Sequence, residues 1–321
     1  MANPVITLLF SMDFISLILA IYMAIIFYKA KPNPMMFYFS LSAAVLNVLA
    51  LLGFAYNFDW HRAPLEMCYF QAIGIQFATF LTGICAFNFI IQVYRLLVLR
   101  EQTEITSSKL ISYYNGLLIA YPIIGTALVT VAAVKTNAIG VRDFKCDVIT
   151  PIWVRMLGYN GINLLISIPG TYFSAHSTIT VIRYLDQFKT SSTVTQGHAP
   201  MIESKNIAKV ATDDSKSSLP RTPGSRTHPN KQYNIKRAAA IRMVFFTVVY
   251  LITNISASIE TIVFVIAGKP LDPHPGGSDI VCVSLGIMLF LIFGTADDVR
   301  KWTVEKLKEL KPSSSSRSFS F

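Results

Sequence analysis

Charged residues are scarce in this sequence, and that scarcity excludes most soluble folds. Only 14% of the 321 residues are Asp, Glu, Lys or Arg, whereas soluble globular domains have about 25%. Hydrophobic residues make up 53% of the chain, and its mean hydropathy is +0.49. The composition therefore predicts a membrane protein.

Cysteine is also rare, and clusters suited to catalysis or metal binding are missing. The four cysteines, Cys68, Cys85, Cys146 and Cys282, are too scattered for a disulfide-rich scaffold or a zinc cluster. The five histidines are dispersed, and the apolar runs lack the grouped His, Asp and Glu that intramembrane metalloenzymes need. We therefore expect no enzymatic activity, no metal and no cofactor.

Long apolar runs are what the sequence does contain. A membrane-spanning helix needs about 20 apolar residues, and each run is expected to be helical because unpaired backbone groups cannot be left in lipid. We expect an all-α membrane protein with a bundle of seven transmembrane helices, the first five within residues 1–185 and the last two within 238–294. The runs are Ile6–Tyr28, Met35–Tyr56, Cys68–Leu99, Leu110–Val134, Val154–Leu185, Ala238–Ala267 and Ser278–Phe293.

Positive charge is concentrated in alternate connections between the runs. If the N-terminus is outside, the inner segments hold most of the 28 Lys and Arg residues, which is the asymmetry of a protein with its C-terminus in the cytoplasm. The net charge of +10 is then mainly a cytoplasmic rim beside anionic lipid. We expect a multi-pass plasma-membrane protein that contacts membrane lipids and binds no nucleic acid.

Two polar segments lie on the predicted cytoplasmic side. Residues 186–237 are rich in Ser, Thr and Lys, which predicts a disordered third cytoplasmic loop. Residues 295–321 begin with "TADDVRKWTVEKLKEL", which predicts an amphipathic helix on the membrane surface, and end in a Ser-rich tail. The predicted apolar face of that helix consists of Val299, Trp302, Leu307 and Leu310.

Two of the cysteines lie on the predicted outer side, where disulfides persist. Cys68 begins the third run, and Cys146 lies in the connection before the fifth. Either the two form a bridge that ties this loop across the mouth of the bundle, or both are free thiols. The bridge is our prediction.

Polar side chains within the runs indicate an interior site. An amide buried without a partner is costly, so Gln71 and Gln76 are expected to face other helices or a cavity. Asp13 and Glu260 lie about seven residues below the outer ends of their helices, roughly 10 Å deep, and Arg155 begins the fifth run. These three charged residues either line one outward-facing pocket or neutralise one another, and we predict the pocket.

Seven predicted spans, an outer N-terminus, and the positions of Cys68 and Cys146 resemble a G-protein-coupled receptor. Rhodopsin-like signatures are missing, because "QVYRLL" stands in place of Asp-Arg-Tyr and "LIFGT" in place of Asn-Pro-x-x-Tyr. The stretches "CYFQAIGIQF" and "CDVITPIWVRMLGY" instead resemble the cAMP-receptor-like and fungal nutrient-sensing receptors. Fungal pheromone receptors are the second choice, since "FGTADDVRK" is similar to the start of their tail.

The resemblance implies a receptor that binds an extracellular small molecule or peptide and activates a heterotrimeric G protein through its Gα subunit. We expect Pro169-Gly170 to act as a hinge in the fifth span. The expected ligand-binding residues are Asp13, Gln71, Gln76, Arg155 and Glu260. The residues expected to couple to the G protein are Arg95, Arg183, Lys236, Arg237 and Arg242. The alternatives are a transporter or channel, against which the missing internal repeats count, and a membrane scaffold that acts without a ligand.

Overall fold

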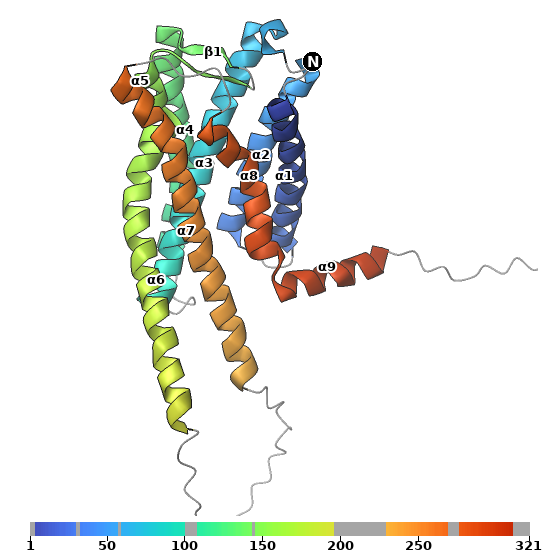
Figure 1. The fold of residues 1–321 in the computed structure, drawn as a ribbon, viewed down its shortest axis with the longest axis vertical. Helices are drawn as coiled ribbons and strands as arrows, with labels where there is room; N and C mark the ends of the chain where they lie inside the picture. Colours follow the sequence, from blue (N-terminus) through green and yellow to red (C-terminus); the bar gives the residue numbers. More distant parts are fainter. Residues whose placement is uncertain are drawn as a thin grey trace, which may run out of the picture.

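The part of the chain described by this computed structural model is almost entirely helical (Figure 1). It comprises residues 4–29, 33–56, 59–99, 108–142, 145–195, 229–268 and 276–310. The α-helices are α1 (Pro4–Lys29), α2 (Pro34–Leu51), α3 (Leu65–Leu97), α4 (Ser108–Thr136), α5 (Ile152–Arg155), α6 (Gly161–Thr195), α7 (Pro229–Ala267), α8 (Gly277–Leu289) and α9 (Asp297–Leu310). Shorter helical segments are η1 (Leu52–Tyr56), η2 (Trp60–Arg62), η4 (Met156–Asn160) and η5 (Phe290–Gly294).

A small β-hairpin distinguishes the two ends of the bundle. Strand β1 (Ile139–Val141) pairs antiparallel with β2 (Cys146–Val148), with Val141 opposite Cys146. The hairpin lies at the same end as the N-terminus of α1, which we call the hairpin end (Figure 1). At the opposite end, here called the α9 end, α6 and α7 extend beyond the other helices, and α9 points sideways away from the bundle.

Five described helices are long and apolar enough to cross a membrane. They are Pro4–Lys29, Pro34–Tyr56, Leu65–Arg95, Gly116–Thr136 and Ile241–Ala267. The segments Asp279–Gly294 and Val299–Lys306 make a sixth if they are counted together, although they meet at 96°. The fold is therefore that of an all-α membrane protein. The predicted fifth span, Val154–Leu185, forms α5, η4 and α6, but α6 falls short of the apolarity of the others.

The segment predicted to be a disordered loop, residues 186–237, is helical at both of its ends. Helix α6 continues to Thr195 and α7 begins at Pro229, so residues 186–195 and 229–237 are helical, not disordered. Once a span has nucleated a helix, each further residue adds a hydrogen bond at little cost, which carries the helix into polar sequence. Residues 196–228 and the Ser-rich tail after Leu310 lie outside the described residues.

Helix α9 begins at Asp297, two residues after the predicted start, and its apolar side packs partly on protein. Val299 belongs to the main hydrophobic core, and Trp302 packs against that core. The hydroxyl groups of Thr303 and Tyr22 are hydrogen-bonded at 2.5 Å, which joins α9 to α1. The part of the predicted apolar face that is described therefore contacts the bundle, while the side chains of Leu307 and Leu310 lie outside the description.

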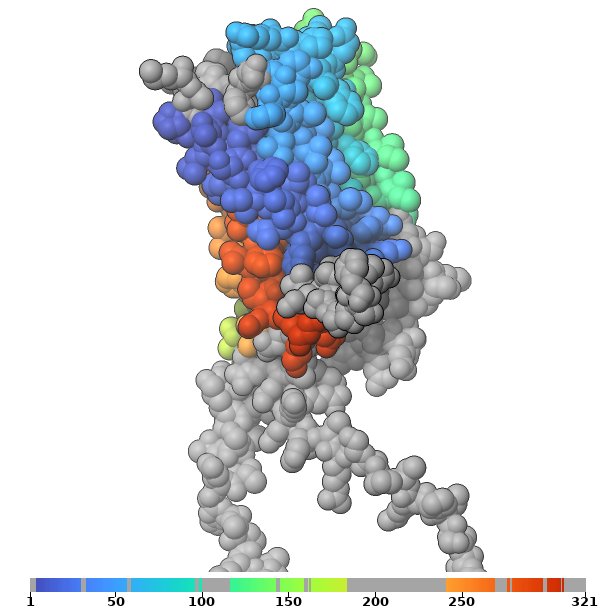
Figure 2. Space-filling view, turned by 90° about the vertical axis from the view of Figure 1, so that its right-hand side faces the viewer, coloured from blue at the N-terminus to red at the C-terminus, as the bar shows by residue number. Residues whose placement is uncertain are grey.

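Helices α1 and α8, from opposite ends of the chain, pack against each other on one face of the molecule (Figure 2). The Gly286 N–H donates to Ser16 Oγ at 3.1 Å, and Asn47 Nδ2 of α2 donates to the same oxygen at 3.0 Å. A Cβ atom at Gly286 would overlap the Ser16 carbonyl oxygen. This polar junction holds α1, α2 and α8 together inside the bundle.

Candidate functional site

A disulfide fastens the β1–β2 hairpin to the mouth of the bundle. Cys68, in the first turn of α3, is bonded to Cys146 at the start of β2, which confirms the predicted bridge. Both cysteines are buried with Trp60 in one small cluster. The hairpin therefore covers the helix ends instead of extending into solvent, and the side chains of residues 145–148 are buried.

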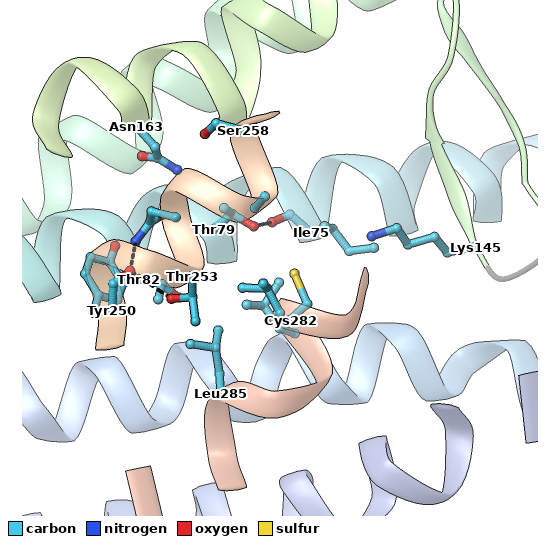
Figure 3. A pocket seen from close by; sticks show the side chains of 14 residues that line it. Ile75, Thr79, Thr82, Lys145, Asn163, Tyr250, Thr253, Ser258, Cys282 and Leu285 are labelled. Carbon is cyan, nitrogen blue, oxygen red and sulfur yellow. Dashed lines mark hydrogen bonds between the residues drawn. The ribbon is translucent and has the colours of Figure 1, made fainter. Parts of the chain in front are cut away.

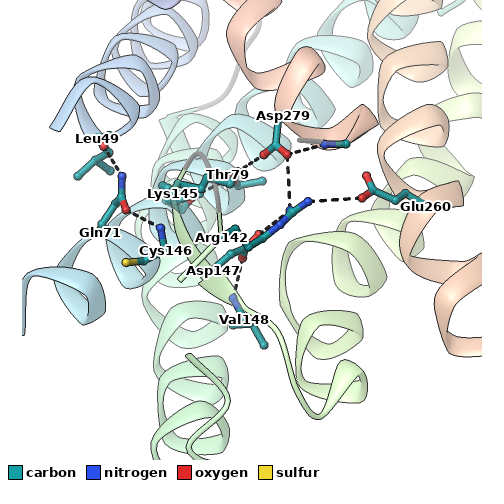
Figure 4. Close-up of polar contacts among 12 residues, drawn as sticks. Leu49, Gln71, Thr79, Arg142, Lys145, Cys146, Asp147, Val148, Glu260 and Asp279 are labelled. Atoms are coloured by element: carbon teal, nitrogen blue, oxygen red, sulfur yellow. Dashed lines mark hydrogen bonds and ion pairs between the residues drawn. The ribbon is translucent and has the colours of Figure 1, made fainter. Parts of the chain in front are cut away.

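Gln71 reinforces this attachment (Figure 4). Its fully buried side chain donates from Nε2 to the Leu49 carbonyl oxygen at 2.7 Å. Its Oε1 accepts a hydrogen bond from the Cys146 N–H at 2.8 Å. One amide thus joins α2, α3 and the hairpin, and both of its ends are engaged by main-chain groups. The predicted ligand residue is, in this structure, a tie between the loop and the bundle.

Asp147 of β2 is the centre of a buried set of charges. Its Oδ2 lies 2.6 Å from Arg155 Nη1 and 3.6 Å from Arg142 Nη1, while its Oδ1 accepts from the Val148 N–H at 2.8 Å. Arg155 has no exposed surface, and its Nε donates to Thr261 Oγ1 of α7 at 3.3 Å. The hairpin is therefore linked ionically to α5 and through Arg155 to α7.

Two further cations of the hairpin region, Lys145 and Arg142, contact Asp279 of α8 (Figure 4). Lys145 Nζ lies 2.7 Å from Asp279 Oδ1, and Arg142 Nη1 lies 3.5 Å from Asp279 Oδ2. Arg142 Nη2 also reaches Glu260 Oε1 of α7 at 3.9 Å. Three cations and three carboxylates therefore balance beneath the hairpin. We call this group the ion cluster: Arg142, Lys145, Asp147, Arg155, Glu260 and Asp279.

The charge state of Asp147 makes a pH dependence testable. Burial raises the pKa of this carboxyl, but Arg155, Lys145 and Arg142 together outweigh burial and hold the pKa below its usual value. A carboxyl whose pKa is lowered by folding stabilises the fold above its unfolded pKa of about 3.9 and loses that contribution as the pH falls further.

We expect the contribution of Asp147 to thermal stability to stay constant between about pH 5 and 8 and to fall below about pH 4. Melting temperatures of the wild type and Asp147→Asn, compared across pH, measure it. A difference between the two proteins that already shrinks between pH 8 and 6 would contradict this assignment.

A cavity lies within the bundle below the ion cluster (Figure 3). It offers about 50 Å³ to the centres of water-sized molecules, enough for roughly three to five of them. Lys145 reaches its hairpin end, and Leu46, Ile75 and Leu285 supply apolar walls. Hydroxyl and amide groups come from Thr79, Thr82, Asn163, Tyr250, Asn254 and Ser258. Such a lining suits a small polar solute with some apolar surface.

The predicted ligand residues are distributed over four environments, of which the attachment of the hairpin by Gln71 is the first. Arg155 and Glu260 belong to the ion cluster, where each contacts a residue of the hairpin region, Asp147 and Arg142 respectively. Gln76 is buried with its amide against Gly158. Asp13 lines a second, smaller cavity, and none of the five predicted residues lines the larger one. The predicted ligand-binding role of these five residues therefore stays a prediction, and the lining of the larger cavity consists of other residues.

The basic residues expected to bind a G protein lie toward the α9 end. Arg95 and Arg242 are half-buried, and Arg183 is exposed. Lys236 and Arg237 are in the helical backbone of α7, and their side chains lie outside the description. These positions leave the predicted coupling role untested.

The predicted hinge at Pro169-Gly170 is not where the backbone is irregular. Helix α6 is continuous through Pro169, and Gly170 is buried facing Ile90 and Phe87 of α3. The non-helical backbone occurs at Gly158, within η4, where ψ is −144°. The break therefore lies nearer the hairpin, beside Gln76 and one turn from α5.

Arg142, Lys145, Asp147 and Asp279 are the site residues that sequence reasoning did not single out. A signal for the first three was their density around Cys146, the cysteine expected to be held at the bundle mouth.

Within the described residues, no group of three or more His, Cys, Asp or Glu side chains is placed to hold a metal ion. Comparison with models of protein families finds no match, and comparison with curated proteins finds none. The residues around the cavity supply a charge, hydroxyls and amides that are suited to contact with a small solute.

Proposed function

We propose that this protein is a seven-helix plasma-membrane receptor that binds an extracellular ligand and promotes nucleotide exchange on a heterotrimeric G protein. The observation that carries the proposal is a cavity with hydroxyl, amide and apolar walls, which lies under a hairpin held by a disulfide and by buried ion pairs. A cavity covered in this way is suited to retaining a solute and sensing it by rearrangement. The likeness of "CYFQAIGIQF" to the cAMP-receptor-like and fungal nutrient-sensing receptors supports the fungal-type group.

In the proposal, α6 is the fifth span, and it completes the seven together with the six candidates named above. Its hydroxyl-rich sequence lowers its apolarity, but these groups are satisfied within the helix. Ser167 donates to the Asn163 carbonyl oxygen at 2.8 Å, Thr171 to that of Ser167 at 2.7 Å, and Thr178 to that of Ser174 at 2.8 Å. Hydroxyls that are bonded to the preceding turn are much less costly in lipid than free ones. A helix with this sequence is thus able to cross the membrane beside α3 and α7.

An aromatic path connects the cavity with the α9 end. Tyr250, which lines the cavity, stacks on Phe246 with ring centroids 6.1 Å apart. Phe246 contacts Phe89 of α3 at 5.4 Å and Phe293 of η5 at 5.5 Å. A ligand that moves Tyr250 must repack these rings, because close-packed interiors do not deform continuously. In the proposed mechanism this repacking shifts α7 and opens the G-protein site at the α9 end.

The test is GTP exchange on purified Gα subunits by the protein in lipid nanodiscs. We expect exchange above the empty-disc baseline, and stimulation by one member of a panel of cyclic nucleotides, sugars, amino acids and farnesylated peptides. Replacing Arg95 and Arg242 with glutamine should return exchange to the baseline, because the basic inner surface that contacts Gα is lost.

Arg62→Gln is the matched control for these two substitutions. Arg62 is an exposed arginine at the hairpin end, paired with Asp59 at 2.8 Å, so the variant should keep full exchange. Folded protein that catalyses no exchange on any Gα would overturn the receptor proposal, and solute flux into liposomes would then favour a transporter. Full exchange by the Arg95→Gln/Arg242→Gln protein would overturn the coupling surface alone.

A further inference from the structure

A second, smaller cavity lies against the first, and two of the acceptor atoms beside it have no hydrogen-bond partner. It offers about 10 Å³ to the centres of water-sized molecules, enough for about one such group. Asp13 and Asn47 both line it, and each is only 1% exposed. Their atoms Asp13 Oδ2 and Asn47 Oδ1 are buried and have no hydrogen-bond partner. Buried acceptors of this kind require a donor, since leaving them unpaired is costly.

The orientation of the Asn47 amide is fixed by its own contacts. Its Nδ2 donates to Ser16 Oγ at 3.0 Å and to the Ala43 carbonyl oxygen at 2.9 Å. Because both hydrogens of the amide are used, the remaining group, Oδ1, is an acceptor only. Asp13 and Asn47 therefore present two unpaired acceptor oxygens to the small cavity.

The charges around this pocket distinguish Asp13 from its neighbours. Lys145 and Asp279 also line the small cavity, but Asp279 is already held by Lys145 at 2.7 Å, by Arg142 at 3.5 Å and by the Gly276 N–H at 2.8 Å. Asp13 Oδ2 has no comparable contact. A donor with a positive charge satisfies both its hydrogen-bonding capacity and its charge.

The two cavities share four lining residues, Leu46, Ile75, Lys145 and Cys282. We propose that together they bind a small α-amino acid. Its ammonium group occupies the small cavity between Asp13 Oδ2 and Asn47 Oδ1, its carboxylate faces Lys145, and its side chain enters the larger cavity. This inference rests on the proposed function and names the ligand class of the same receptor.

A zwitterion fits these sites better than either of its halves. Its ammonium group pairs with Asp13 and its carboxylate pairs with Lys145, whereas a lone cation makes only the first of these contacts and a lone anion only the second. A carboxylic acid without an amine leaves the Asp13 and Asn47 acceptors unpaired. The larger cavity has room for roughly three to five water-sized groups, which limits the ligand to the size of glycine, alanine or serine.

The test is calorimetric titration of the full chain in nanodiscs with alanine, ethylamine and propanoate. Ethylamine is alanine without its carboxylate group, and propanoate is alanine without its amino group. We expect alanine to bind at least tenfold more tightly than either of the other two. Asp13→Asn should weaken alanine binding at least tenfold, whereas Asp59→Asn, which changes an exposed carboxylate at the hairpin end, should leave it unchanged.

A second variant keeps the test independent of how Asp13→Asn folds. Ala257 lines the larger cavity, so Ala257→Leu fills that space while Asp13 is retained, and it should also weaken alanine binding at least tenfold. Propanoate binding as tightly as alanine, or alanine binding unchanged in both variants, overturns the proposal. Alanine binding that is abolished by sodium chloride but not by choline chloride assigns the small cavity to sodium instead and also overturns it.

The outcomes separate this site from the proposed receptor activity. Alanine binding that depends on Asp13, without GTP exchange on any Gα, supports the site and counts against the receptor. Exchange driven by another member of the panel, with no alanine binding, supports the receptor and overturns the amino-acid site.

Discussion

Replacing Asp147 with asparagine is expected to lower the free energy of unfolding by about 3–5 kcal/mol. The substitution preserves the shape of the side chain and an acceptor for the Val148 N–H, but it removes the charge that Arg155 contacts at 2.6 Å. Arg155 is completely buried and has no route to water. A buried charge that loses its partner keeps its full desolvation penalty, which is why the expected loss is large.

Asp59→Asn is the matched control. Asp59 Oδ2 and Arg62 Nε form a pair of similar length, 2.8 Å, but these side chains are 40% and 73% exposed. Ion pairs in contact with solvent contribute about 0–1 kcal/mol, so this variant should unfold almost like the wild type. Thermal unfolding of the three proteins in the same nanodiscs measures the contrast. Equal losses in the two variants would show that burial of the ion cluster does not determine its contribution.

The helices were predictable because their signal is local. Apolar runs of spanning length gave α1, α2, α3, α4, α7 and α8 at nearly their observed positions. The fifth span was harder to verify, since α6 carries many hydroxyls whose cost in lipid depends on bonds to the preceding turn. The extension of α6 and α7 into the polar loop was missed, because composition reports solubility and not the propagation of a helix that already exists.

The site was only partly predictable because its charges come from a folded-back loop. Cys68, Cys146 and Gln71 were recognised as important near the bundle mouth, and they are the residues that hold the hairpin there. Arg142, Lys145 and Asp147 have the sequence character of a solvated loop, and only the hairpin's attachment buries them. Asp13 was identified from its charge within a span, but the second unpaired acceptor of the small cavity comes from Asn47 on another helix. Such pairings are set by tertiary packing, which no local pattern encodes.

The final prediction concerns the junction between α1 and α8, where Gly286 of α8 lies directly against Ser16 of α1. Gly286→Ala places a Cβ against the Ser16 main-chain carbonyl oxygen and the Ser16 hydroxyl. Overpacking of this kind costs about 1–3 kcal/mol or more, and we expect the upper part of that range because the obstacle is backbone and Ser16 also binds Asn47.

Gly116→Ala is the control, because no atom lies within 4 Å of a Cβ at that exposed position of α4. Alanine is favoured over glycine in a helix by about 0.5–1 kcal/mol, so the same substitution should raise the melting temperature there and lower it at Gly286. Opposite signs in one thermal-unfolding experiment would locate the effect in the α1–α8 contact. A Gly286→Ala protein as stable as the wild type would instead mean that the two helices are free to separate, and the pocket formed by Asp13 of α1, Asn47 of α2 and Asp279 of α8 would lose its fixed geometry.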